Sequence, residues 1–163
     1  MGFIEKTIRR NLERKESTMA QIKAEYENVD EFAKYAKGLK TKYPEIFDGI
    51  DVDRIKCVSI TNKERGKSKK KLWSILPVKQ PIRMDCPFSY YVILFASDWA
   101  ELNEKMRLLL VADALQSIPT DDEGKILSPD MHEYAIMPRT FGVDFMDNEK
   151  IPHLLDEKVN WKR

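Results

Sequence analysis

The run FSYYVILFA at residues 88–96 constrains the fold of this chain more than any other feature. Aromatic and aliphatic residues follow one another almost without interruption, a composition typical of a β-strand. Because apolar residues occupy both faces of such a strand, it belongs at the centre of a sheet that is covered on both sides. We therefore expect residues 88–96 to form a central, doubly covered strand around which the domain is arranged.

Two weaker segments predict further strands. RIKCVSI at residues 54–60 and LWSILPV at residues 72–78 are short runs of β-branched and apolar residues. Pro77 indicates a sheet edge or a strand end, because proline lacks the N–H that a central ladder needs. The lysine-rich segment NKERGKSKKK at residues 62–71 is interpreted as a solvated hairpin loop that turns at Gly66.

Helix signals surround these strands. Asp30 is expected to cap a helix that stops before Pro44, and Asn103 to cap a second helix that is closed by Pro119. A further helix is expected around residues 129–140. Together these elements predict an α+β fold, in which a small mixed β-sheet is packed by two or three helices.

The N-terminal residues carry an apolar stripe at helical spacing, with Lys15 at its one gap. A long amphipathic helix of this kind is stable only if something covers its stripe, either its own domain or a partner such as a second copy. We divide the chain into an N-terminal amphipathic helical extension, residues 1–29, and one domain with its C-terminal tail, residues 30–163. The stripe consists of Ile4, Ile8, Leu12, Met19, Ile22 and Tyr26.

The composition of the chain indicates which partners and which cellular compartment to expect. The net charge is only +1, so no global field draws the chain to nucleic acid or to acidic membranes. Cys57 and Cys86 lie in strand-like or apolar stretches, which favours reduced thiols in a cytosolic protein over a disulfide. The charged N-terminus lacks the apolar core of a signal peptide, and no apolar run approaches the roughly 20 residues of a membrane span. We expect a cytoplasmic protein.

The segment LLLVADALQSIPTDDEG at residues 108–124 contains the frame of a metal site without its ligands. Ala112 and Gln116 are four residues apart and share one helix face, and Asp113 follows the first of them. Two histidines at that spacing, with glutamate after the first, form the zinc-binding HExxH motif. Here neither histidine is present.

The order of the surrounding motifs resembles one family. The strong strand is followed by DW at residues 98–99, a helix, DDEG at residues 121–124, another helix and FGVD at residues 141–144. This order and spacing resemble the metallopeptidases encoded by many phages, over roughly residues 30–155. The resemblance implies a zincin-like fold, with HExxH on the first of the two helices and a third zinc ligand at the start of the second.

Carried over residue by residue, the resemblance puts the first histidine at Ala112, the glutamate at Asp113, the second histidine at Gln116 and the third ligand at Pro129. Alanine and proline offer no side-chain ligand, glutamine is a poor zinc ligand, and aspartate is one methylene shorter than glutamate. The resemblance therefore implies a pseudo-enzyme with no catalytic residue, no metal and no cofactor. Such a protein acts by binding another protein, of the host or the phage, and would inhibit a host process or a defence system such as CRISPR.

Two alternatives remain open. Asp113, Asp130 and His132 would form a rebuilt metal site if the chain were a metal-dependent hydrolase. In the second alternative the basic loop contacts phosphates as part of a nucleic-acid-binding accessory protein, through Lys67, Lys69, Lys70 and Lys71. We favour surface roles for His132 and for the lysines.

Individual residues carry further expectations. Asp113, read as a structural remnant, is expected to cap a neighbouring loop or to pair with Arg107 or Arg139, because a buried carboxylate needs a partner. His153 is expected on the surface, and Trp161 is expected to be exposed and to anchor an interface. The partner-binding candidates are Ile4, Ile8, Leu12, Met19, Ile22 and Trp161.

Overall fold

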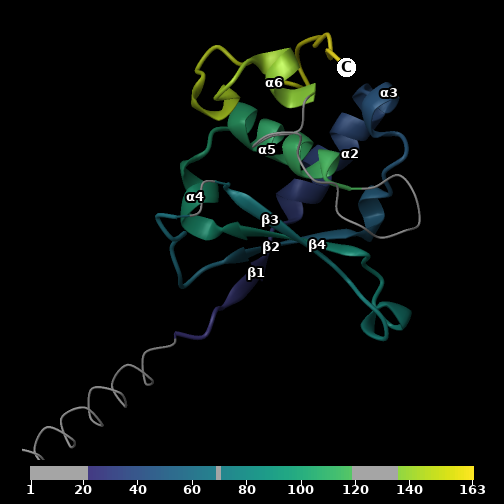
Figure 1. The fold of residues 1–163 in the computed structure, drawn as a ribbon, viewed down its shortest axis with the longest axis vertical. Helices are drawn as coiled ribbons and strands as arrows, with labels where there is room; N and C mark the ends of the chain where they lie inside the picture. Colours follow the sequence, from purple (N-terminus) through teal and green to yellow (C-terminus); the bar gives the residue numbers. More distant parts are fainter. Residues whose placement is uncertain (1–21, 69–70, 119–135) are drawn as a thin grey trace, which may run out of the picture.

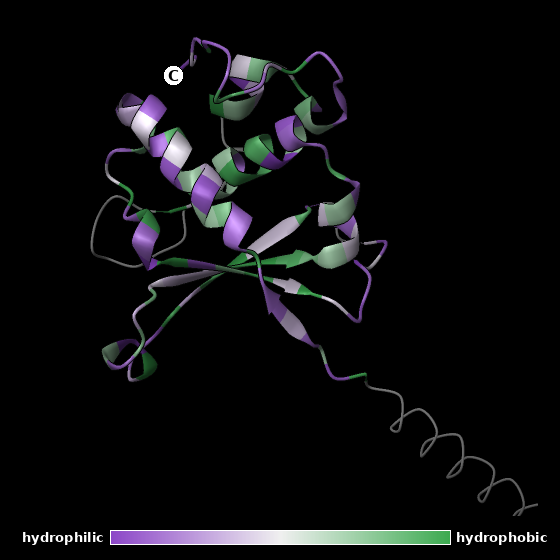
Figure 2. Ribbon diagram, turned by 180° about the vertical axis from the view of Figure 1, so that it is seen from behind, coloured by the Kyte–Doolittle hydropathy of each residue, from purple (hydrophilic) through white to green (hydrophobic). Residues whose placement is uncertain are grey.

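A computed structural model describes residues 22–68, 71–118 and 136–163. Its helices form a layer on one side of a four-stranded sheet, as Figures 1 and 2 show. The strands are β1 (Tyr26–Asn28), β2 (Ile55–Ile60), β3 (Trp73–Pro77) and β4 (Tyr90–Phe95). The helices are α2 (Asp30–Lys42), α3 (Pro44–Phe47), α4 (Ala96–Glu101), α5 (Glu104–Gln116) and α6 (Ile136–Phe141), with the short 3₁₀ turns η1 (Val52–Arg54), η2 (Ile82–Met84) and η3 (Phe145–Asp147).

The fold is α+β, as predicted, with a mixed sheet in the order β1-β2-β4-β3. β4 pairs in parallel with β2 and antiparallel with β3, so its central position is confirmed. The hairpin interpretation of residues 62–71 is wrong, because β4 lies between β2 and β3. The segment after β2 instead crosses to the far side of β4, and Arg65 Nε donates to Asp98 Oδ2 of α4 at 2.8 Å.

β4 is not covered on both faces as predicted. Tyr90, Val92 and Leu94 are buried against the helices, whereas Tyr91 and Ile93 on the opposite face are only half-buried. The described helices all lie on the first side (Figures 1 and 2). Apolar residues on both faces of a strand indicate that both faces are shielded from water. They do not indicate whether elements of the same domain or of another chain pack on each face.

α5 is the central helix of the layer, and every residue from Leu108 to Leu115 is buried. Its predicted cap is confirmed, since Asn103 Oδ1 accepts a hydrogen bond from Met106 N at 3.0 Å. Asp30 is the first residue of α2 rather than its cap, which is Val29. The predicted helix at residues 129–140 is described only from Ile136 onward. In the described part of the chain, no helix has the length and apolarity to span a bilayer.

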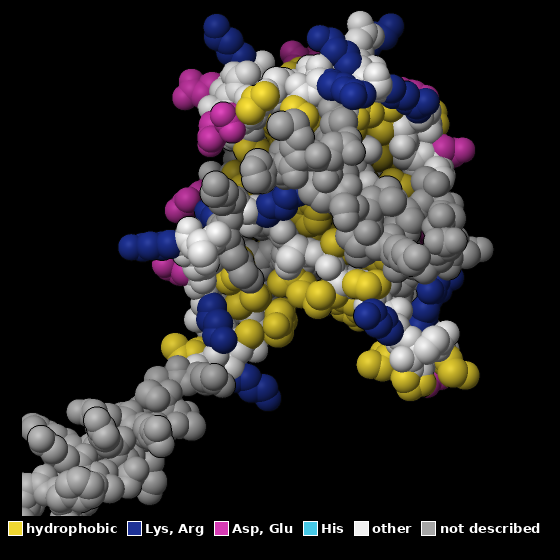
Figure 3. Space-filling view, in the orientation of Figure 1, with side chains coloured by type: hydrophobic (Ala, Val, Ile, Leu, Met, Phe, Trp, Pro, Cys, Tyr) yellow, Lys and Arg dark blue, Asp and Glu magenta, His cyan; other side chains and the backbone are white. Residues whose placement is uncertain are grey.

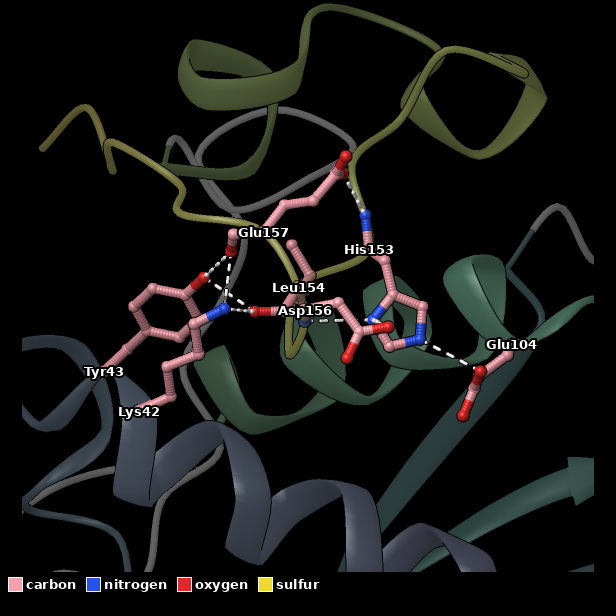
Figure 4. A network of polar contacts seen from close by, with 7 residues as sticks. All are labelled: Lys42, Tyr43, Glu104, His153, Leu154, Asp156 and Glu157. Atoms are coloured by element: carbon pink, nitrogen blue, oxygen red, sulfur yellow. Dashed lines mark hydrogen bonds and ion pairs between the residues drawn. The ribbon is translucent and has the colours of Figure 1, made fainter.

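The C-terminal segment is tied to α2 and α5 by the contacts in Figure 4. Lys42 Nζ and Tyr43 Oη both donate to the carbonyl oxygens of Leu154 and Glu157, at 2.5 to 3.0 Å. His153 Nε2 lies 3.0 Å from Glu104 Oε2 at the start of α5, the distance of an ion pair when the ring is protonated. The His153 side chain is only 12% exposed, so the surface position expected for it is wrong.

The sheet begins within the segment that the sequence assigns to the extension. Tyr26–Asn28 pair with β2, and Thr61 N donates to Glu25 O at 3.0 Å. These residues therefore belong to the packed domain.

The two cysteine thiols are expected to differ in reactivity. Cys57 is 4% exposed on the covered face of β2, and this burial raises the pKa of its thiol, whereas Cys86 is half-buried. A raised pKa leaves less of the reactive thiolate at mildly alkaline pH. Iodoacetamide should therefore alkylate Cys86 in the folded protein and Cys57 only after unfolding, as followed by peptide mass spectrometry. Equal labelling of both thiols would contradict the burial of β2.

Candidate functional site

Ala112 and Asp113 lie in the buried middle of α5, where the helix packs against β3, and Gln116 is the half-buried last residue of the helix. Ala112 is fully buried and Asp113 is 5% exposed. Asp113 Oδ2 accepts a hydrogen bond from the indole Nε1 of Trp73 at 2.9 Å. Because Trp73 begins β3, this bond joins α5 to the edge strand of the sheet.

The arginine partners that the sequence suggests for Asp113 are wrong. The structure pairs it with Trp73 rather than with Arg107 or Arg139. Arg107 instead donates from Nη1 to Glu31 Oε2 at 3.0 Å and from Nε to the carbonyl oxygen of Trp99 at 3.1 Å, so it ties α5 to α2 and α4. No spacing in the sequence brings residue 73 to residue 113, because the contact depends on how the sheet packs on α5.

Glu31, the partner of Arg107, also accepts a hydrogen bond from the Tyr35 hydroxyl at 2.5 Å. Burial of the phenol, together with the bond to this carboxylate, raises the pKa of Tyr35 to about 12. Glu31 therefore accepts bonds from a guanidinium and a neutral phenol. These contacts hold α2 against α5, and they lie at the N-terminal end of α5, away from the motif positions.

Gln116 lies one turn beyond Ala112, on the same face of α5. Its side-chain nitrogen is buried and has no hydrogen-bond partner among the described residues. Zinc sites in proteins are built from histidine, cysteine and carboxylate ligands. These three positions supply a methyl group, a carboxylate already bonded to an indole, and an amide whose buried group is a donor. They do not fit a zinc ion.

The rebuilt metal site falls mostly outside the described residues. Pro129, Asp130 and His132 are not described, and Asp113 is the one candidate whose position is known. Within residues 22–68, 71–118 and 136–163, no group of three or more histidine, cysteine or acidic side chains is placed to hold a metal. His153 illustrates why, since Glu104 and Asp156 approach opposite nitrogens of its ring and share no centre with it.

The basic loop is described only in part. Lys67 is exposed, Lys69 and Lys70 lie outside the described residues, and Lys71 is half-buried with its ammonium 4.8 Å from the centre of the Trp73 ring. Lys71 thus packs on the same indole that bonds to Asp113. The four lysines do not form one uniformly solvated row.

Trp161 is half-buried and not exposed as expected. Its ring makes edge contacts with Tyr43, Phe47 and Phe141 at centroid distances of 5.4 to 5.8 Å. It also lines a pocket of about 530 Å³ near Lys42 and Lys158, and no motif position of α5 lines that pocket. Ile22 of the predicted stripe is 60% exposed, whereas the other stripe candidates, Ile4, Ile8, Leu12 and Met19, lie outside the described residues.

The family model described as "putative phage metallopeptidase" matches residues 24–157. The chain belongs to this family. The match confirms the resemblance predicted over residues 30–155 and extends it to include β1, and the observed fold is compatible with a zincin-like one. The chain matches no curated protein and no solved structure.

The hydrogen bond between Trp73 and Asp113 is expected to stabilise this family member measurably. Trp73→Phe removes the indole donor and leaves a buried carboxylate with one bond fewer, at a cost of about 1–3 kcal/mol. Trp161→Phe is the matched control, because its indole nitrogen has no hydrogen-bond partner among the described residues. Urea unfolding should show a larger loss of unfolding free energy for Trp73→Phe. Equal losses would mean that only ring packing matters at Trp73.

Proposed function

We propose that this chain is a non-catalytic member of the phage metallopeptidase family and acts by binding another protein. The observation that carries the proposal is the state of the motif in α5. Ala112 is part of the core, and Asp113 is engaged by Trp73. Metallopeptidase chemistry needs a metal to acidify water and a carboxylate free to take its proton. Ala112 offers no side-chain ligand for a metal, and the carboxylate of Asp113 is bonded to the indole of Trp73.

A protein-binding role is supported by the loop between β3 and β4, which projects from the body of the domain. Its turn η2 carries Ile82 and Met84, which are 70% and 78% exposed. In Figure 3 this loop lies at the lower right and is largely hydrophobic at its tip. Exposed apolar side chains gathered on a protruding loop are typical of contact sites, and methionine adapts well to a partner surface.

The proposed partner is a protein of the host or of the phage, met in the host cytoplasm. A phage gains from inhibiting a host process, and a defence system such as CRISPR is one target of that kind. A rigid domain without catalytic activity suits such a role, because its surface residues can be substituted for a new partner while the core residues that maintain the fold are kept. The fold alone does not specify the target.

The first test is metal content, measured by elemental mass spectrometry on untagged protein after incubation with zinc and removal of the excess. We expect well under one zinc per chain. Restoring the motif as Ala112→His, Asp113→Glu, Gln116→His and Pro129→His should raise zinc retention toward one per chain. The same variant with Gln116 unchanged is the matched control and should retain less zinc.

One tightly held metal in the wild-type chain would overturn the non-catalytic proposal. If His132→Ala then removed that metal, the rebuilt site and a metal-dependent hydrolase would take its place. Salt-sensitive binding of nucleic acid that is lost on neutralising Lys67, Lys69, Lys70 and Lys71 would instead support the accessory-protein alternative.

The second test concerns the projecting loop. We expect quantitative affinity capture from host lysate to identify a protein that wild type retains and that Ile82→Asp/Met84→Asp loses, because aspartate cannot enter an apolar contact. Val143→Asp is the control, since Val143 is 82% exposed on another part of the surface. Capture that is unchanged in the loop variant would exclude η2 as the contact site.

A further inference from the structure

The side of the sheet that faces away from the helices is mostly apolar, although Asn28, Lys56 and Ser74 also lie on it, and we call it the outer face. Residues paired across neighbouring strands present their side chains on the same side. Tyr26 is paired with Ile60, Val58 with Ile93, and Leu76 with Tyr91. These pairs place six apolar or aromatic side chains together, namely Tyr26, Val58, Ile60, Leu76, Tyr91 and Ile93.

No described helix covers the outer face, and among the described residues Phe88 and Cys86 of the β3–β4 loop contact Tyr91 at its edge. Tyr26 and Leu76 are each 55% exposed, and the other four of the six apolar residues are half-buried. In Figure 3 hydrophobic side chains gather along the lower side of the sheet, in a hollow between the start of β1 and the β3–β4 loop. An exposed apolar surface of this extent is typical of an interface.

The sequence contains a surface that matches this face in shape and chemistry. The stripe formed by Ile4, Ile8, Leu12, Met19 and Ile22 has the spacing of one side of a helix. A helix over residues 3–22 would be about 30 Å long. Four strands of up to six residues make a face about 14 Å wide and about 20 Å long, so such a helix spans it from corner to corner.

The described start of the chain favours a second copy over the chain's own face. Residues 23–25 continue alongside residues 61 and 62, because Asn62 Nδ2 donates to Lys23 O at 2.6 Å and Glu25 N donates to Asn62 Oδ1 at 2.8 Å. Figures 1 and 2 agree that this start points away from the helical layer. Residues 19–27 read MAQIKAEYE, without glycine, proline, asparagine, aspartate or serine to reverse the chain tightly.

We propose that two copies of this chain form a symmetric dimer in which the N-terminal stripe of each copy packs on the outer face of the other. The dimer contains two such contacts, which a two-fold axis makes equivalent. Together they bury the stripe and the outer face of both copies. The dimer is built from the stripe and the outer face, and it requires neither the motif positions of α5 nor Ile82 and Met84 of η2. It therefore does not depend on the proposed function.

The test is the mass of the full-length protein by light scattering after size exclusion. Wild type should have twice the 19.1 kDa of one chain. Leu12→Asp in the stripe and Leu76→Asp on the outer face should each weaken the dimer at least about tenfold, because each buries a charge in an apolar contact. Thermal unfolding followed by circular dichroism checks that each variant still folds.

Two controls carry the same change in charge outside the contact. Ser17→Asp lies opposite the stripe on the same predicted helix, and Val143→Asp replaces an exposed apolar residue elsewhere. Both should remain dimers. If Ser17→Asp dissociated the dimer as strongly as Leu12→Asp, the contact would not be made by the stripe.

Mixing the two contact variants provides the decisive measurement. The Leu12→Asp chain keeps an intact outer face, and the Leu76→Asp chain keeps an intact stripe. An equimolar mixture should therefore associate more strongly, through one restored contact, than either variant does alone. A monomeric wild-type protein would overturn the proposal and leave coverage by the chain's own stripe as the alternative. A dimer that neither variant weakens would overturn it as well.

Discussion

The packing of α5 against one face of the sheet is the contact on which the rest of this structure depends. All residues from Leu108 to Leu115 are buried, so this part of the helix is enclosed on every side rather than along a single stripe. α2 is tied to it through Glu31 and Arg107, and the C-terminal segment through His153 and Glu104. Ala112 and Asp113 therefore lie at the structural centre of the domain. A side chain at either position must fit the packing of the core, whatever other role it has.

That position limits which side chains the three motif positions can carry without a metal. In a metallopeptidase, the bound metal offsets the free-energy cost of burying polar ligands. Without the metal, histidines at 112 and 116 would leave buried polar groups, whereas Ala112 removes one group altogether. Asp113 remains because Trp73 supplies a donor at 2.9 Å, and Gln116 keeps a buried amide without a partner among the described residues. These contacts show how the three positions are accommodated in the core, and they are the basis of the proposal that the chain is non-catalytic.

The sequence predicts those parts of the fold that depend on local pattern. Residues 88–96 predict the central strand, and Asn103 predicts the start of α5, because strand composition and capping are properties of neighbouring residues. The crossing of residues 61–72 past β4 was missed, because hairpin and crossover loops share one composition. The contact between Trp73 and Asp113 was missed for a related reason. It joins elements 40 residues apart, and single-sequence reasoning supplied an arginine because arginine is the commonest partner of a buried carboxylate.

The error about β4 is the most informative one. Its sequence is apolar on both faces, yet the described domain covers only one of them. A half-covered sheet of this composition costs solubility unless its free face is shared with another surface, and the first residues of the same chain repeat apolar side chains at helical spacing. The sheet has an apolar face that no described helix covers, and the predicted N-terminal helix has an apolar stripe that needs a surface to pack on. Each can cover the other. The prediction of a doubly covered strand was therefore wrong for the single domain, but it describes the dimer proposed for the full chain.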